Sequence, residues 1–230
     1  MLVLAIDSAM NGCSACVFDV DEGVLNAQHL DIVRGQAEHL MPLINDVMQK
    51  SDVNYSDLDM IAVTQGPGAF TGMRIGLSTA KSIGMVINKP VVGVSCFDAI
   101  LESCFNDNRT MGAVPFYGVI LETKRKDYYF KMFEGELSAG VHAAAMDASD
   151  IMSITHGKEC LFVGDAVERY ADEIGQDIKS VSINAPKADV IARLAIDKYK
   201  NKDKNAINCA PVYLRLPEIG KPKNPPRVLK

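Results

Sequence analysis

The residues best suited to do chemistry lie in a glycine-rich turn, Gly66 to Arg74, with the sequence Gly-Pro-Gly-Ala-Phe-Thr-Gly-Met-Arg. Gly66 and Gly68 permit positive φ and close approach of another backbone. The helix expected after this turn, with Thr71 as its cap, would present unpaired N–H groups and a positive dipole end. Such a turn can hold an anion. It lacks the lysine and hydroxyl of a P-loop and the spacing of a dinucleotide fingerprint, so neither motif is indicated.

Small residues recur every four positions in the expected helix, at Gly72, Gly76, Ala80 and Gly84. This spacing places them along one ridge. Each interior glycine costs about 0.5–1 kcal/mol relative to alanine, so a close contact along the ridge is expected to offset that loss. The ridge can pack on this chain's own sheet or on a helix of a second subunit. Exposed methionines, such as Met73 and Met85, would favour the second subunit.

Two strand ends supply further candidate residues. Asp7 and Ser8 follow the first apolar run, and Gly164 and Asp165 follow a later one. Ligand groups are often found at strand ends in sheet proteins, although a carboxylate there can also accept hydrogen bonds within its own turn. The residues that could contact a phosphate are Asp7, Ser8, Gly66, Gly68, Thr71, Gly164 and Asp165.

The sequence does not favour a metal site. No two histidines form the HxxxH spacing of a helical metal pair; they are His29, His39, His142 and His156. Cys13 and Cys16 form a lone CxxC without a second pair. With no secretory signal, the six cysteines are expected to be reduced, and this pair to be buried as small hydrophobic residues.

Composition and charge indicate a globular protein, with 48% hydrophobic and 23% charged residues. The net charge of −5 argues against binding nucleic acid or an anionic membrane over the whole surface, so any RNA contact must be local. The apolar run Met1–Ile6 lacks a basic flank and is too short for a signal peptide or a membrane span. We therefore expect a cytoplasmic protein without membrane contact.

The elements that must position these residues follow from hydrophobic periodicity. Strands are predicted over Leu2–Ile6, Cys13–Val20 and Val24–Ile32, forming an antiparallel meander. An amphipathic helix is predicted over Gln36–Lys50. The remaining elements of the first half are a strand over Met60–Thr64, a helix over Thr71–Asn88, a strand over Val91–Val94 and a helix over Phe97–Phe105.

The second half opens with another predicted hairpin. Its expected elements are strands over Val114–Glu122, Asp127–Phe133 and Cys160–Val163 and helices over Val167–Ile174 and Asp189–Lys200. A polar run at 106–109 marks a boundary, so the predicted units are a first lobe over 1–106 and a second over 107–216. Residues 217–230 are proline-rich and basic and are expected to form an extended tail whose Lys221, Lys223, Arg227 and Lys230 could touch RNA phosphates.

The element order and the Gly66–Gly76 motif together resemble the bacterial TsaB (YeaZ) family. Matching segments elsewhere are Leu4–Ser8, Glu38–Pro42, Gly93–Ser95, Val163–Asp165 and Pro211–Arg215. The resemblance implies an α/β fold of two lobes, namely an actin-like/Hsp70-like ATPase (ASKHA, ribonuclease H-like) fold with a truncated second lobe. The first lobe would carry the dimerisation helices.

The resemblance also implies a non-catalytic subunit that helps transfer a threonylcarbamoyl group to the adenosine next to the anticodon of tRNAs. Its partners would be the catalytic paralogue TsaD and the ATPase TsaE, with a homodimer when TsaD is absent and tRNA reached indirectly or through the tail. The helices Gln36–Lys50 and Thr71–Asn88 would form the interface. The interface residues would be His39, Leu40, Leu43, Val47, Gly72, Met73, Gly76, Ala80 and Gly84.

One departure from the family pattern concerns metal binding. In the catalytic paralogue an HxxxH pair binds metal, whereas the corresponding stretch here keeps only His39, so no metal and no cofactor are predicted.

Two other hypotheses follow from the residues. The first of them is an ATP-using enzyme of the sugar-kinase/Hsp70 superfamily, with Asp7 and the two glycine turns at the phosphates. Ala166-Val167, where small residues would be expected, argues against tight ATP binding. The other hypothesis is a metallopeptidase, which the sequence does not support because it offers no pair of metal ligands.

Overall fold

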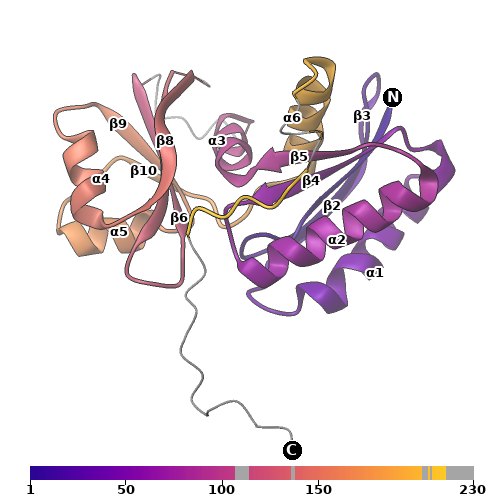
Figure 1. Ribbon diagram of the computed structural model, residues 1–230, viewed down its shortest axis with the longest axis horizontal. Helices are drawn as coiled ribbons and strands as arrows, with labels where there is room; N and C mark the ends of the chain where they lie inside the picture. The colour runs from indigo at the N-terminus through magenta and orange to yellow at the C-terminus, as the bar shows by residue number, and fades with distance from the viewer. Residues whose placement is uncertain (107–113, 136–137, 204–206, 208, 216–230) are drawn as a thin grey trace, which may run out of the picture.

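The first lobe is built on a sheet of five strands with the order β3-β2-β1-β4-β5 (Figure 1). These strands are β1 (Leu2–Asp7), β2 (Cys13–Asp19), β3 (Gly23–Leu30), β4 (Met60–Gly66) and β5 (Val91–Ser95). The computed structural model describes residues 1–106, 114–135, 138–203, 207 and 209–215. β1, β2 and β3 pair antiparallel, as expected, while β4 pairs parallel to β1 and to β5.

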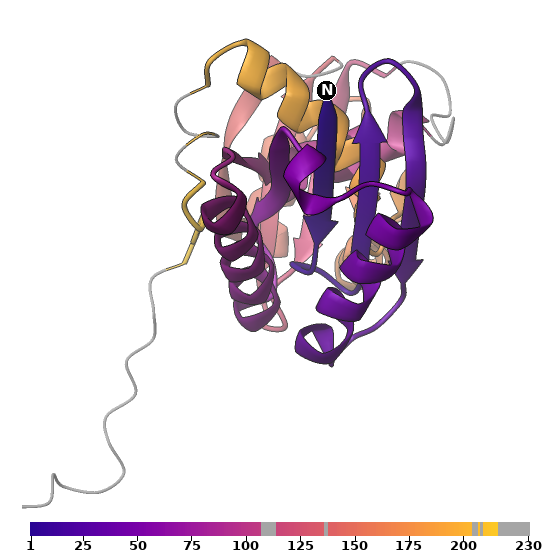
Figure 2. The same cartoon turned by 90° about the vertical axis from the view of Figure 1, so that its right-hand side faces the viewer.

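Helices cover both faces of this sheet, which explains why the apolar residues of β1 and β4 are almost all buried, whichever face they point to. α1 (Gln36–Lys50) and α2 (Phe70–Ile87) lie side by side on one face (Figure 2). α6 (Ala188–Lys200) covers the other face through small and branched residues at helical spacing. The range 107–216 predicted for the second lobe therefore contains a helix that packs on the first sheet.

The second lobe repeats the arrangement of the first. Its sheet has the order β10-β9-β6-β7-β8. The strands are β6 (Phe116–Glu122), β7 (Tyr128–Glu134), β8 (Ser138–Met146), β9 (Cys160–Gly164) and β10 (Ser180–Ser182). β6, β7 and β8 form an antiparallel meander, and β9 pairs parallel to β6 and to β10. The two lobes are thus related by topology, as the repeated hairpin indicated.

Three elements of the second lobe lack a counterpart among the sequence predictions: β8, β10 and α4 (Ala148–Thr155). α4 and α5 (Val167–Ile174) pack beside each other on the outer side of the second sheet (Figure 1). A short 3₁₀ turn, η1 (Tyr55–Asp57), leads into β4.

The lobes are joined by shared packing as well as by the chain. α3 (Cys96–Asn106) lies between them and contacts β6 and β9. One core cluster contains Leu4 and Ile6 of the first sheet together with Val119 and Val163 of the second. The described C-terminal segment, 209–215, runs between the lobes (yellow in Figure 1). The predicted tail, 217–230, lies outside the described residues. Among the helices within the described ranges, none is long and apolar enough to span a membrane.

Candidate functional site

A cleft of about 760 Å³ opens between the two lobes, close to the glycine-rich turn. The first lobe contributes the β1–β2 loop, the start of α1 and the start of α2. The second contributes the β6–β7 turn and the β9–α5 turn, and the C-terminal segment adds Val212, Tyr213 and Arg215. Of the residues predicted to contact a phosphate, this cleft is lined by Gly68, Thr71 and Asp165.

The start of α2 differs from its sequence prediction. The helix begins at Phe70, its N-cap is Ala69, and no side chain caps it, so Thr71 lies within the first turn. Thr71 is exposed and lines the cleft. Because no side chain competes for the first N–H groups, this end of α2 keeps its positive dipole toward the cleft.

The glycines of the turn hold two segments of this chain together. A Cβ at Gly68 would lie 2.2 Å from the Ala9 carbonyl oxygen, and a Cβ at Gly72 would lie 2.1 Å from the Ser8 carbonyl oxygen. Hydrogen bonds join the same segments, from the Ala69 amide to the Ala9 carbonyl (2.7 Å) and from the Ser8 hydroxyl to the Gly72 carbonyl (2.8 Å). The close backbone approach indicated by the sequence is therefore made by the β1–β2 loop.

Asp7 and Ser8, both predicted to contact a phosphate, are fully buried. The Asp7 carboxylate accepts hydrogen bonds from the Thr64 hydroxyl (2.5 Å) and the Ala9 amide (3.1 Å), while its Oδ2 has no partner among the described residues. Burial raises the pKa of Asp7 to about 6, against the lowering effect of the Thr64 hydrogen bond. A phosphate in the cleft cannot reach either side chain without opening this packing.

The substitution Asp7→Asn tests this burial through the pH dependence of stability. Because the folded-state pKa is raised from 3.8 to about 6, the protonated form stabilises the fold below pH 3.8 and that stabilisation is lost as the pH rises through 6. The difference corresponds to about 3 kcal/mol in the free energy of unfolding. Urea unfolding at several pH values should show a decline between pH 4 and 7 that is smaller by about 3 kcal/mol for Asp7→Asn than for the wild type, while the decline due to Asp165, whose pKa is also raised to about 6, remains. The exposed Asp21→Asn serves as control; an unchanged profile in Asp7→Asn would contradict the assignment.

Gly164 and Asp165 also serve the packing of this chain. Gly164 has φ of +136°, and a Cβ there would lie 2.1 Å from the Ile120 carbonyl oxygen. Asp165 accepts hydrogen bonds from the Glu122 amide (2.9 Å) and from the Asn11 side chain (3.3 Å), which connects the second lobe to the first. Burial raises the pKa of Asp165 to about 6. Gly66 is likewise approached by the Met73 sulfur and the Val212 carbonyl.

Basic side chains line the cleft from several separate segments. They are Arg34, Arg74, Lys124, Arg125 and Arg215, against the acidic residues Glu122 and Asp165. These positions come from the chain before α1, the first turns of α2, the β6–β7 turn and the C-terminal segment, so sequence spacing could not group them. The local run 124–126 at the β6–β7 turn is the single signal visible in the sequence.

Two aromatic rings lie at the rim of the cleft beside Arg74. The Phe70 and Tyr213 rings are 55% and 45% exposed, and their centroids are 5.5 Å apart. The Arg74 guanidinium carbon lies 3.8 Å from the Phe70 ring centroid, and its Nε donates to the Tyr213 hydroxyl at 2.8 Å. The Val212 amide donates to the Gln65 carbonyl at 2.8 Å, which fixes the C-terminal segment to the first lobe.

The residues predicted for a partner interface occupy a different place from the one expected. Leu40, Leu43, Val47, Met73 and Ala80 are at most 5% exposed and belong to the core. The small-residue ridge of α2 faces this chain's own sheet, so of the two alternatives the structure supports internal packing. The nearest atoms to a Cβ at Gly76 and at Gly84 are the Ser8 hydroxyl and a Val91 methyl group. These predicted interface residues are therefore not available to a partner, with the exception of His39, which is exposed.

The outer surface of the same two helices is apolar. A groove of about 510 Å³ between α1 and α2 is lined by Met41, Tyr55, Ser78, Thr79, Ser82, Ile83, Val86 and Ile87. Val86 is 84% exposed, and the neighbouring Met85 is 82% exposed. Large apolar side chains with this exposure are typical of an interaction surface rather than of an isolated helix face.

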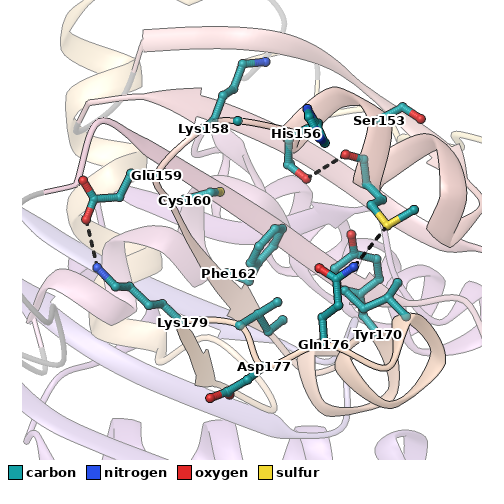
Figure 3. Close-up of a pocket in the computed structure, with 15 residues that line it drawn as sticks. Ser153, His156, Lys158, Glu159, Cys160, Phe162, Tyr170, Gln176, Asp177 and Lys179 are labelled. Atoms are coloured by element: carbon teal, nitrogen blue, oxygen red, sulfur yellow. Dashed lines mark hydrogen bonds and ion pairs between the residues drawn. The ribbon is translucent and has the colours of Figure 1, made fainter.

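A further pocket lies on the outer side of the second lobe (Figure 3). It has a volume of about 800 Å³ and includes Phe162 and Tyr170, whose ring centroids are 5.4 Å apart. Lys179 points toward Glu159 at its rim, forming an ion pair of 2.8 Å (Figure 3). None of the site residues predicted from the sequence lies among those lining this pocket within the described chain.

The cysteines behave as the CxxC interpretation expected. Cys13 and Cys16 lie on opposite faces of β2, in the two different core clusters that pack on this sheet, and are fully buried. Burial raises the pKa of both thiols to about 12, so both are protonated at neutral pH. Among the described residues, no group of three or more His, Cys, Asp or Glu side chains is placed to hold a metal ion.

Comparison with known proteins identifies the family. A family model described as "TsaD: tRNA N6-adenosine threonylcarbamoyltransferase" matches residues 31–210. The tRNA threonylcarbamoyladenosine biosynthesis protein TsaB of Escherichia coli (strain K12) is 25% identical over 94% of this chain and 95% of its own length. A tRNA N6-adenosine threonylcarbamoyltransferase of Erythrobacter litoralis is 36% identical over 41% of this chain and 32% of its own.

Solved structures confirm the fold. YeaZ from Pseudomonas aeruginosa superposes with a TM-score of 0.75 at 21% identity, covering 93% of this chain and 99% of that one. An activator of 2-hydroxyisocaproyl-CoA dehydratase from Clostridium difficile has a TM-score of 0.51 at 10% identity, over 89% of this chain and 98% of that one. The predicted two-lobed ASKHA-type fold is thus confirmed. The chain belongs to the TsaD family and, within it, to the TsaB (YeaZ) proteins of tRNA threonylcarbamoyladenosine biosynthesis.

Proposed function

We propose that this chain is a non-catalytic subunit of the complex that transfers a threonylcarbamoyl group to the adenosine next to the anticodon of tRNAs. It pairs with the TsaD-family protein that carries out the transfer, a TsaE-like ATPase joins the assembly, and the complex works in the cytoplasm. The observation that carries the proposal is the exposed apolar surface of α1 and α2, on a chain that belongs to this family.

The shape of that surface suits a helical partner. The groove runs between two helices, is lined almost entirely by apolar and hydroxyl side chains, and has Val86 exposed within it. A helix or loop with apolar side chains can fill such a groove and remove Met41 and Val86 from water. Because the partner is a paralogue, we expect its corresponding helices to offer the same kind of surface. A homodimer through the same surface is the expected state when that partner is absent.

The burial of the predicted phosphate contacts supports a role without catalysis. An ATP-using enzyme needs groups that reach the phosphates and their metal ion. Here Asp7 and Ser8 are fully buried, and the glycines that would allow a phosphate to approach are filled by the chain's own carbonyl groups. The likeness to an activator with bound ADPNP concerns the fold alone, so it does not support the ATP-using hypothesis for this chain.

Size-exclusion chromatography with light scattering tests the pairing. The full chain, the TsaD-family protein of the same genome and an equimolar mixture are compared. We expect the mixture to give one species with the summed mass of the two chains, replacing any homodimer. Two proteins that elute separately at micromolar concentration would contradict the proposed pairing.

A further inference from the structure

The rim of the inter-lobe cleft combines exposed aromatic rings with basic side chains. Phe70 and Tyr213 present their rings next to each other, with the Arg74 guanidinium packed on Phe70. Arg34 and Lys124 line the same cleft from the other segments. Arg34 makes no ion pair within the described part of the chain, and Lys124 contacts the neutral side chain of Asn11 at 3.3 Å.

This basic cluster is local in an acidic protein. The whole chain has a net charge of −5, yet five basic and two acidic residues line the cleft. One of the five, Arg215, is paired with Asp127. Arg34, Arg74 and Lys124, together with the positive end of α2, attract an anion specifically to this place.

The aromatic rings indicate which kind of anion the cleft can bind. A small anion such as inorganic phosphate would use the basic residues but not the rings. A double helix keeps its bases stacked on each other, so exposed rings gain nothing from it. Single-stranded nucleic acid offers both phosphates and unstacked bases, and proteins bind it by placing bases on aromatic side chains or arginine planes beside a basic groove.

We propose that this cleft rim binds single-stranded RNA, with bases stacking on Phe70 and Tyr213 and phosphates contacting Arg34, Arg74 and Lys124. The choice of RNA over DNA rests on the proposed function, in which the substrate is a tRNA. The loop that carries the modified adenosine is single-stranded and fits this description. The rim would therefore hold part of the tRNA while the partner subunit performs the transfer.

The contacts of Tyr213 and Arg74 suit this role. The hydroxyl of Tyr213 is held by Arg74 Nε, which fixes the ring while leaving 45% of the side chain exposed. Arg74 uses one of its five N–H donors in this bond, so the others can reach a phosphate. The C-terminal segment is held to the first lobe by the Val212–Gln65 hydrogen bond, so the stacking surface is formed before RNA arrives.

The test uses the complex of the full chain with its TsaD-family partner and a fluorescent anticodon stem-loop RNA, with fluorescence anisotropy measured at several salt concentrations. Tyr213→Ala and Phe70→Ala should each raise the Kd about fivefold or more, because each removes a stacked base contact. Tyr213→Phe keeps the ring but loses the hydrogen bond from Arg74, so it should raise the Kd by less than Tyr213→Ala does. Arg34→Ala and Lys124→Ala should each lower the slope of log Kd against log salt concentration by about 0.7. Lys179→Ala, which removes an exposed charge outside the cleft, is the charge-matched control.

The outcomes separate this inference from the proposed function. Thermal melting and complex formation are measured for each variant, so that a folding defect is recognised. If Tyr213→Ala loosens the C-terminal segment, Phe70→Ala tests the stacking contact instead. If the wild-type chain supports tRNA modification but the four alanine variants in the cleft bind RNA with the wild-type Kd and salt slope, the RNA site is refuted while the proposed function stands. If RNA binding falls as expected but modification never needs the chain, the proposed function fails instead.

Discussion

Replacing Val86 by aspartate is expected to weaken the association of this chain with its TsaD-family partner by about 30-fold or more. Val86 is 84% exposed and lines the apolar groove between α1 and α2. Its side chain makes little contribution to this chain's own core, so the fold should survive the change. In the complex, a carboxylate at this position would lose its hydration inside an apolar contact, which is strongly unfavourable. Titration calorimetry with the purified partner measures the change in Kd.

A matched variant separates the effect of the groove from the effect of charge. Lys81→Ala changes the net charge by the same amount on the same helix, but its position is about 140° around the helix axis from Val86. Lys81 does not line the groove. The Kd should therefore stay within about threefold of the wild type, since isolated surface charges contribute little. Equal effects of the two variants, or no effect of Val86→Asp, would remove the groove from the interface.

Gly72→Ala is expected to destabilise the folded chain by about 2–4 kcal/mol, although alanine is the better helix former by about 1 kcal/mol. The reason is the Ser8 carbonyl oxygen, which would lie 2.1 Å from the added Cβ. That carbonyl belongs to the backbone beside β1, and the Ser8 hydroxyl is itself bonded to the Gly72 carbonyl. Neither segment can move without breaking the contact between the β1–β2 loop and α2. Chemical denaturation measures the free energy of unfolding.

Two positions on the same helix provide the controls. At Gly76 the nearest atom to an added Cβ is the Ser8 hydroxyl, at 2.7 Å. This hydroxyl belongs to a side chain and can rotate away by giving up its hydrogen bond to the Gly72 carbonyl, without a backbone shift, so Gly76→Ala should cost less than Gly72→Ala. Ser78 is exposed in the groove, and Ser78→Ala should be neutral or slightly stabilising. A neutral or stabilising Gly72→Ala would mean that the turn is not held by its own chain.

The sequence predicted the first lobe well because its elements carry strong local signals. α1 begins and ends where the periodicity placed it, at Gln36 and Lys50. The predicted start of α2 was wrong. Thr71 is a favourable cap, but the contact of the Ala69 amide with the Ala9 carbonyl places the N-cap two residues earlier, at Ala69. β8 could not be found from propensity, since it is rich in alanine and forms by pairing with β7.

The site was harder to predict than the fold because its residues are brought together by tertiary structure. The spacing of the small residues on α2 correctly indicated a close contact but carried no information about which surface provides it. The same holds for the glycine-rich turn, whose close neighbour is the Ser8–Ala9 backbone, not a ligand. The basic residues of the cleft come from segments far apart in the chain. The pairs Asp7–Ser8 and Gly164–Asp165 could be placed at strand ends in advance, because each follows an apolar run.

Reconstitution of tRNA modification tests the central claim most directly. The purified TsaD-family protein, the TsaE-like ATPase, the threonylcarbamoyl donor and unmodified tRNA are combined with and without this chain, and the modified nucleoside is quantified by mass spectrometry. We expect modification to require the chain, to fall with Val86→Asp, and to be absent when the chain is the only protein added. Equal modification without the chain, or modification by the chain alone, would contradict its role as a non-catalytic partner.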